Sequence, residues 1–71
     1  MYIIMEIQKN NDGSIGVPPI ITKEDRNEAE SEYCSIRAVA AISKLPQHTV
    51  IMMEDNGKLY DFKCYTHEKE K

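Results

Sequence analysis

Side chains that could do chemistry are few in this 71-residue chain, and they are scattered. Two cysteines and two histidines make a nominal zinc-type set of Cys34, His48, Cys64 and His67. Only the last two are close in sequence, whereas structural zinc sites usually draw their ligands from two short paired motifs. We therefore expect no metal site and no cofactor. Two cysteines are also too few for a disulfide scaffold, and we interpret both as small, reduced core residues of a cytoplasmic protein.

Catalytic patterns are also missing from the sequence. Neither cysteine is accompanied by a glycine-rich turn that could supply an oxyanion hole. Gly13, Gly16 and Gly57 are explained by turns, so no phosphate-binding loop is expected. The acidic residues cluster at the start of a predicted helix, where carboxylates are solvated or cap the helix. We therefore expect a protein that is not an enzyme.

Two arginines are better candidates, for binding. Arg26 falls in the first turn of the predicted helix, where free backbone N–H groups attract anions. Arg37 lies in the middle of the helix among apolar neighbours, and its position has two interpretations. The favoured one is a contact one turn earlier on the same helix, with Glu30, Glu32 or Tyr33. The alternative places Arg37 at a subunit interface, where it binds a carboxylate or phosphate in a bidentate manner.

We expect aromatic side chains to accompany these cations in one binding site. His48 and Tyr65 are predicted to lie opposite one another at the end of a hairpin, where they could stack on a base. Plain cross-strand packing is the commoner explanation for such a pair. The ligand-binding candidates share a cationic or aromatic side chain: Arg26, Arg37, His48, Tyr60 and Tyr65.

The first part of the chain predicts two strands. Residues 2–8 alternate between two faces, with Ile3, Met5 and Ile7 on one of them. Residues 10–14 are rich in turn formers, and Asp12-Gly13 suits a type I′ hairpin loop. A short second strand is expected over 14–17. Pro18 and Pro19 lack N–H donors, so any continuation of this strand lies at a sheet edge or outside the sheet.

The predicted helix begins near Asp25 and ends near Leu45. Asp25 and Glu28 fit a reciprocal capping pattern, with Thr22 as a competing cap, and Pro46 prevents continuation. The second half of this helix is apolar almost all round. Deep burial under a sheet explains that composition, and so does packing against a second copy of the chain.

A hairpin follows the helix. Residues 48–55 and 58–65 are predicted as paired strands around Asn56-Gly57, a strong hairpin signal. One face of this hairpin is apolar and aromatic, with the pairs Met53–Tyr60, Ile51–Phe62 and Thr49–Cys64. The reverse face is mixed, with the pairs Glu54–Leu59, Met52–Asp61, Val50–Lys63 and His48–Tyr65.

Together these elements predict an α+β fold, in the order β-(β)-α-β-β. One helix lies across a small antiparallel sheet of three to four strands, in a single domain over 1–71 with a frayed tail at 65–71. One helix cannot cover both sheet faces, so we expect an exposed apolar patch that a homo-oligomer buries. The expected patch comprises Tyr2, Ile4, Val50, Met52, Leu59 and Tyr65. The oligomer interface is expected to comprise Ile4, Ala38, Ala41, Ile42, Leu45, Val50 and Met52.

Composition excludes several partners. The net charge is −3, with 9 Lys and Arg against 12 Asp and Glu, and no basic run is present, so double-stranded nucleic acid is not an expected partner. The longest apolar run, 38–42, is far shorter than the roughly 18 residues of a membrane span. The N-terminus meets an acid at Glu6 without a basic segment before it, which argues against a secretory signal.

Three short motifs carry a resemblance: Glu6-Ile7-Gln8, Asn27-Glu28-Ala29-Glu30 and Cys64-Tyr65-Thr66-His67. With them, the chain resembles a set of very small proteins encoded by phages and prophages of Firmicutes. The likeness covers roughly residues 2–67, and its motifs are structural. The chain departs from the pattern at Cys34, at Arg37 and at Pro18-Pro19. This set has no assigned activity, so no catalytic role is implied.

What the resemblance implies is a cellular context. Small acidic phage proteins that are not enzymes either inhibit host defence or serve as accessory parts of the particle. We therefore expect an anti-defence protein in the host cytosol, which blocks a host defence protein or sequesters a nucleotide immune signal between the subunits of a homo-oligomer. A structural accessory protein of the phage particle, with no small-molecule ligand, is the alternative.

Overall fold

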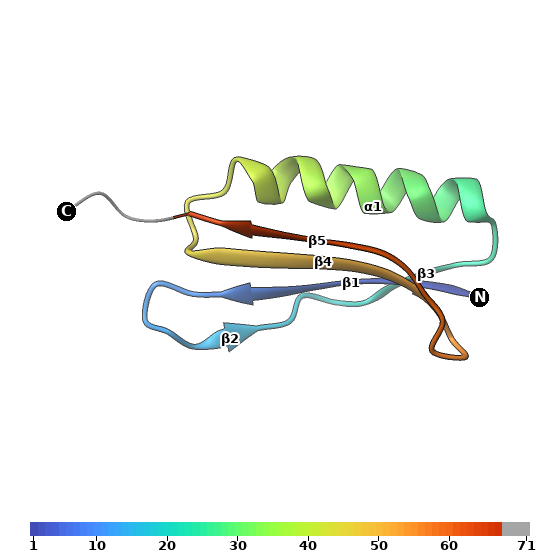
Figure 1. Cartoon of the computed structure of the whole chain (residues 1–71), viewed down its shortest axis with the longest axis horizontal. Coiled ribbons are helices and arrows are strands. Elements are labelled where there is room, and N and C mark those ends of the chain that lie inside the picture. The colour runs from blue at the N-terminus through green and yellow to red at the C-terminus, as the bar shows by residue number, and fades with distance from the viewer. Residues whose placement is uncertain (68–71) are drawn as a thin grey trace.

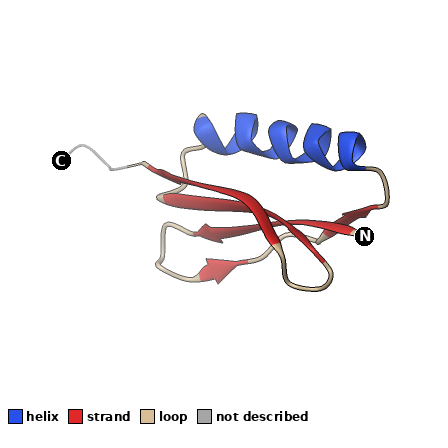
Figure 2. Ribbon diagram, turned by 45° about the vertical axis from the view of Figure 1, so that its right-hand side comes forward, coloured by secondary structure: helices blue, strands red, loops and turns tan. Residues whose placement is uncertain are grey.

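The chain folds as one helix on a five-stranded antiparallel sheet, in a computed structural model that describes residues 1–67 (Figures 1 and 2). The elements follow in the order β-β-β-α-β-β. Their bounds are β1 Tyr2–Lys9, β2 Ile15–Gly16, β3 Ile21–Lys23, α1 Arg26–Ala41, β4 Gln47–Glu54 and β5 Leu59–Thr66. The α+β architecture is thus confirmed, with five strands in place of three to four.

The long strands β1 and β4 lie side by side at the centre of the sheet. β5 forms one edge beside β4, while β2 and β3 both pair with β1 at the other edge. The predicted second strand is therefore only two residues long. The chain leaves the sheet around Pro18 and Pro19 and returns as β3, a strand the sequence analysis did not assign.

Helix α1 begins as predicted and ends early. Asp25 is the N-cap, and its Oδ2 accepts a hydrogen bond from the backbone N–H of Glu28 at 3.0 Å. The competing cap at Thr22 is excluded, because Thr22 belongs to β3. The last helical residue is Ala41, four residues before the predicted end. Beyond it, Ser43 caps the turn by accepting a hydrogen bond from the backbone N–H of Leu45.

Both hairpin loops are one residue longer than the two-residue turns predicted at Asp12-Gly13 and Asn56-Gly57. In the first, the backbone N–H of Gly13 donates to the carbonyl of Asn10, which itself pairs with Ser14. In the second, Gly57 donates to Glu54, which pairs with Lys58. A type I′ turn needs positive φ at both central residues, yet in the described chain only Gly13 and Gly57 have it. Each loop is therefore three residues long and closed by its glycine.

The longer second loop shifts the hairpin register by one residue, and a β-bulge restores it. Met53 pairs with Leu59 while Met52 pairs with Asp61, so Tyr60 is the extra residue on β5. The predicted pairs Met53–Tyr60 and Glu54–Leu59 are therefore wrong. The remaining predicted pairs are confirmed: Ile51–Phe62, Thr49–Cys64, Met52–Asp61, Val50–Lys63 and His48–Tyr65.

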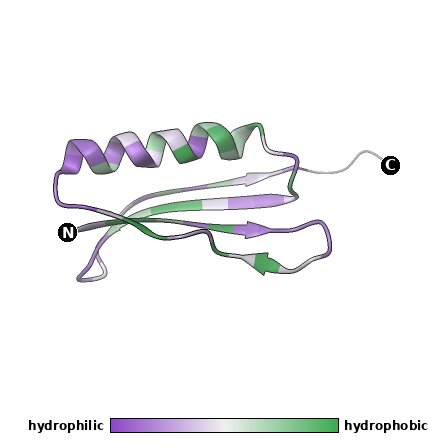
Figure 3. Ribbon diagram, turned by 180° about the vertical axis from the view of Figure 1, so that it is seen from behind, coloured by the Kyte–Doolittle hydropathy of each residue, from purple (hydrophilic) through white to green (hydrophobic). Residues whose placement is uncertain are grey.

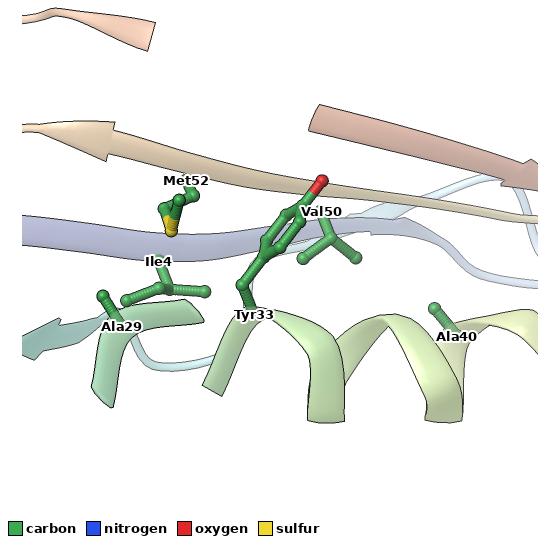
Figure 4. Close-up of a cluster of buried hydrophobic side chains, with 6 residues drawn as sticks. All are labelled: Ile4, Ala29, Tyr33, Ala40, Val50 and Met52. Atoms are coloured by element: carbon green, nitrogen blue, oxygen red, sulfur yellow. The ribbon is translucent and has the colours of Figure 1, made fainter. Parts of the chain in front are cut away.

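The hydrophobic core lies between α1 and the face of the sheet that the sequence analysis took to be exposed (Figure 4). Ile4 and Val50 are fully buried and Met52 is 3% exposed. They pack with Ala29, Tyr33 and Ala40 of the helix. Ile4, Val50 and Met52 are thus core residues of the single chain, and their placement in an exposed patch and oligomer interface is corrected.

A polar pair closes this core at one end. His48 is 4% exposed, and its Nδ1 lies 2.5 Å from the Oε2 of Glu6 on the neighbouring strand. The two side chains contact one another through Nδ1 of His48, so a face that carries Glu6 and His48 can be buried, although Nε2 of His48 is buried without a partner among the described residues. This pair explains how the face that looked mixed in sequence packs against the helix.

Within residues 1–67, no helix covers the opposite side of the sheet (Figure 2). Strand alternation directs Ile3, Met5, Ile7, Ile51, Met53 and Phe62 to this side, which we call the open face. Phe62 is 59% exposed. The apolar surface that a single chain leaves uncovered is therefore the reverse of the one predicted.

The end of the described chain is ordered further than expected. Tyr65 and Thr66 belong to β5. His67 donates its backbone N–H to the carbonyl of Pro46, and its Nε2 lies 2.9 Å from the carbonyl oxygen of Ala40. The predicted frayed tail is thus wrong for 65–67, and its remaining residues lie outside the described part of the chain. Within the described residues, no helix is long and apolar enough to cross a membrane.

Candidate functional site

An open groove lies where the second half of α1 passes over the edge strand β5. It has a volume of about 270 Å³ and is lined by Cys34, Arg37, Ala38, Ala41 and Tyr65. The helix contributes the first four at a spacing that places them along one side. Small alanine side chains leave the groove open, and Arg37 and Tyr65 supply its polar atoms. The structure thus brings together two predicted ligand-binding residues and two predicted interface residues.

Arg37 is held by two tyrosines. Its Nε donates a hydrogen bond to the hydroxyl of Tyr65 at 3.2 Å, and its guanidinium carbon lies 5.5 Å from the centroid of the Tyr33 ring. The contact with Tyr33, one turn earlier, is one of the predicted alternatives. No carboxylate within residues 1–67 lies at ion-pair distance from Arg37. The predicted partners Glu30 and Glu32 therefore do not neutralise it.

Further charges surround the groove. The hydrogen bond to Tyr65 raises the pKa of Arg37, so its guanidinium stays charged. Burial raises the pKa of Tyr33, and the negative charge of Asp61 raises it further. Lys63 places its Nζ 5.7 Å from the centroid of the Tyr65 ring. Tyr65 thus contacts two cations, Arg37 and Lys63, while the carboxylate of Asp61 acts on Tyr33 and Arg37.

Arg26 and Tyr60 form a separate cluster at the start of the helix. The guanidinium carbon of Arg26 lies 4.8 Å from the centroid of the Tyr60 ring, and its Nε forms an ion pair with Glu30 at 3.3 Å. The bulge turns Tyr60 to the helix side, where its hydroxyl donates to Glu54 and its ring packs on Tyr2 at 5.5 Å. Arg26 and Tyr60 contact one another, and each also contacts a glutamate. The predicted single site that joins them to Arg37 is therefore not formed.

His48 is likewise not a surface residue. It pairs across the strands with Tyr65, as predicted, but its side chain is buried against Glu6 and its ring lies 6.3 Å from that of His67. A base cannot stack on a ring that is 4% exposed. The simpler explanation, cross-strand packing, describes His48, and only Tyr65 of this pair reaches the groove.

Both cysteines are exposed, which corrects their assignment to the core. Cys34 lines the groove, and Cys64 faces the open side of the sheet opposite Thr49. Among the described residues, no three His, Cys, Asp or Glu side chains gather where they could hold a metal ion. The sequence analysis missed Cys34 as a groove residue, although it lies one turn before Arg37 and Ala38 on the helix.

The helix residues predicted for an oligomer interface lie at the second, more apolar half of α1 and just beyond it (Figure 3). Ala38 and Ala41 are exposed in the groove, and Ile42, after the helix, is 83% exposed. Val39 beside them is 67% exposed, while Leu45 is half-buried. An apolar surface therefore borders the groove.

Comparisons with known proteins add no relative. No protein-family model matches the chain. No curated protein and no solved structure matches it either. The groove is therefore the feature that bears on function.

Proposed function

We propose that this chain is a non-enzymatic binding protein that acts as a homo-oligomer and holds a nucleotide-type anion at Arg37. The proposal depends on the burial, the charge and the contacts of the Arg37 side chain. Arg37 is half-buried and permanently charged, it contacts two tyrosines, and no described carboxylate pairs with it. Its Nε bond to Tyr65 fixes the guanidinium, whose terminal N–H groups suit bidentate binding of a phosphate.

The groove around Arg37 favours a phosphate with an attached ring. Its volume of about 270 Å³ is slightly below the range of roughly 300–1,000 Å³ for small-molecule sites. Tyr65 offers an aromatic side chain for stacking, and the alanines of α1 allow close approach. One chain therefore suits part of a dinucleotide.

The biological role that we propose is inhibition of host defence. The resemblance to small phage-encoded proteins supports this context, and a binding protein without catalytic groups suits sequestration of a nucleotide immune signal. The same groove and the apolar residues beside it, Val39 and Ile42, would also suit contact with a host defence protein.

A structural role in the phage particle is the second candidate. The open face and the exposed apolar residues beside the groove favour it, because both are surfaces suited to assembly. In that role Arg37 would contact a carboxylate of a neighbouring subunit in place of a small molecule.

Thermal shift with a panel of adenine-containing dinucleotides and cyclic ADP-ribose separates these roles. We expect stabilisation by at least one of them, with the ligand recovered intact after denaturation. Arg37→Ala should weaken its binding about ten- to hundredfold, from the loss of charge-assisted hydrogen bonds. Arg26→Ala is the matched control and should bind normally, because Arg26 is engaged with Tyr60 and Glu30.

Other results would reassign the protein. Chemical alteration of the ligand after incubation would indicate an enzyme. No shift with any member of the panel, together with open-ended assembly, would favour the structural role. Equal loss of binding in Arg37→Ala and Arg26→Ala would show that the groove is not the binding site.

A further inference from the structure

We infer that two copies of this chain pair through their open faces, so that the two sheets pack against one another with the helices outside. The inference rests on the homo-oligomeric part of the proposed function and assigns it a surface. The open face takes the place of Ile4, Val50 and Met52 in the predicted oligomer interface, because those three side chains are buried under α1.

The composition of the open face is the first argument. Charged residues make up 30% of the chain, yet strand alternation places only Lys9, at the end of β1, on this side of the described strands. Its centre is Ile3, Met5, Ile7, Ile51 and Met53. Because the centre of the open face carries no charge, it can pack against the same surface of a second copy. A two-fold axis brings the two identical patches together.

The size of the open face is the second argument. Three strands of eight residues and one row made of the short strands β2 and β3 span about 20 Å by 26 Å, at about 4.8 Å between strands and about 3.3 Å per residue, which gives a footprint of at most about 500 Å². Protruding side chains make the accessible area larger than this flat footprint, and a stable interface needs about 800 Å² per partner. The open face therefore approaches the size that a dimer interface needs, and no other apolar face of the described sheet is left uncovered.

The sheet edge and the charge of the chain argue against two other modes of contact. The edge strand β5 carries Lys63, and Lys58 precedes it, and lysines at an edge discourage strand-to-strand pairing between molecules. An anionic membrane surface would need a cluster of cations around the patch, whereas Lys9 is the one cation placed on this side of the described strands. A second copy therefore fits the face better than an edge partner or a lipid surface.

Packing of the two sheets also adds a second core to a very small domain. The described chain buries only a few apolar side chains under α1, and a chain of this length is marginal alone. In the dimer the open face becomes a layer between two sheets about 10 Å apart. Both Arg37 grooves stay accessible, because each lies on the helix side of its own sheet.

The two cysteines provide a built-in test. Cys64 lies on the open face and Cys34 lines the groove on the helix side, and both are exposed in a single chain. Wild-type protein is labelled with a maleimide over a range of concentrations, and each site is quantified by peptide mass spectrometry. At a concentration about 100 times the dimer dissociation constant, Cys64 should react about tenfold more slowly than in dilute protein, because under a tenth of the chains are then monomeric. Cys34 should react at the same rate throughout.

Light scattering on matched variants completes the experiment. The wild type should have twice the 8.2 kDa mass of one chain. Phe62→Lys should halve the mass, since Phe62 is exposed on the open face, while Val39→Lys on the helix should leave it unchanged. Circular dichroism confirms that each variant is folded, and if Phe62→Lys is not, Cys64 protection in the wild type remains the readout.

The opposite pattern would overturn the inference. A wild-type monomer, equal labelling of both cysteines at all concentrations, or dissociation caused by Val39→Lys alone would each do so. Failure of the proposed function is distinguishable from this outcome. Arg37→Ala should weaken ligand binding about ten- to hundredfold in a protein that is still a dimer, and Phe62→Lys should bind the ligand as a monomer.

Discussion

Replacing Tyr33 with phenylalanine should make the protein more stable. The Tyr33 side chain is 3% exposed in the core, and its hydroxyl is buried without a hydrogen-bond partner among the described residues. An unsatisfied buried donor costs about 1–3 kcal/mol. Phenylalanine keeps the ring, its packing and its contact with Arg37, so Tyr33→Phe should raise the free energy of unfolding by about 1 kcal/mol. For a domain of this size that corresponds to a rise of about 4–8 °C in Tm.

The matched control removes the same oxygen atom from a partnered tyrosine. Tyr65 accepts the hydrogen bond of Arg37, so Tyr65→Phe should lower the free energy of unfolding by about 0.5–1.5 kcal/mol. Both variants are compared with the wild type by urea denaturation, followed by circular dichroism at one protein concentration, because association affects apparent stability. A loss of stability in Tyr33→Phe similar to that in Tyr65→Phe would refute the reasoning, since it would mean that the Tyr33 hydroxyl has a partner.

Three further predictions concern the cap, the core and alkaline pH. Asp25→Ala removes the N-cap of α1 and should cost about 1 kcal/mol in urea denaturation, with Asp25→Asn close to the wild type. Ile4→Val in the core should cost about 0.5–1.5 kcal/mol, and a cost near zero would contradict its full burial under the helix. The hydrogen bond to Glu54 raises the pKa of Tyr60 above its unfolded value, so its contribution is complete below about pH 10 and is lost as the pH rises through the folded pKa. Between neutral and alkaline pH, the Tm of Tyr60→Phe should therefore fall less than that of the wild type. An equal fall in both proteins would contradict this assignment.

Much of the fold could be predicted from local patterns. The Asp25 cap, the turn glycines and the alternation of β4 and β5 act over a few residues, and the cap residue, both hairpins and most of the β4–β5 pairs were found. The reciprocal hydrogen bond to Glu28 and the two strand pairs nearest the second turn were not found among the described residues. Each loop is one residue longer than predicted. The hairpin register survived because the bulge at Tyr60 compensates for the longer loop at Gly57.

The choice of sheet face could not be predicted in the same way. β1 is apolar on both sides, with Ile4 on one and Ile3 on the other, so alternation alone does not say which side the helix covers. The decisive contact joins Glu6 to His48, 42 residues apart, and it makes a polar end of the core tolerable. The exposure of Cys64 follows from the same choice, because Cys64 lies on the side that the helix leaves open.

Only part of the candidate site could be predicted, because some of its contacts join residues far apart in the sequence. Arg37 stood out because a long cation lies among apolar helix residues, and its partner Tyr65 was also selected. The sequence could not show that Tyr60 turns toward Arg26, since the bulge that directs it depends on the geometry of the loop. Nor could it show that His48 is buried.

A titration of isotope-labelled protein followed by two-dimensional NMR tests the central claim most directly, with adenine-containing dinucleotides and cyclic ADP-ribose as probes. The account predicts saturable shifts at Cys34, Ala38, Ala41 and Tyr65 and in the Nε–H signal of Arg37, with the Nε–H signal of Arg26 unchanged. No shift at the groove with any probe at millimolar concentration, or shifts centred on Arg26 and Tyr60, would contradict it.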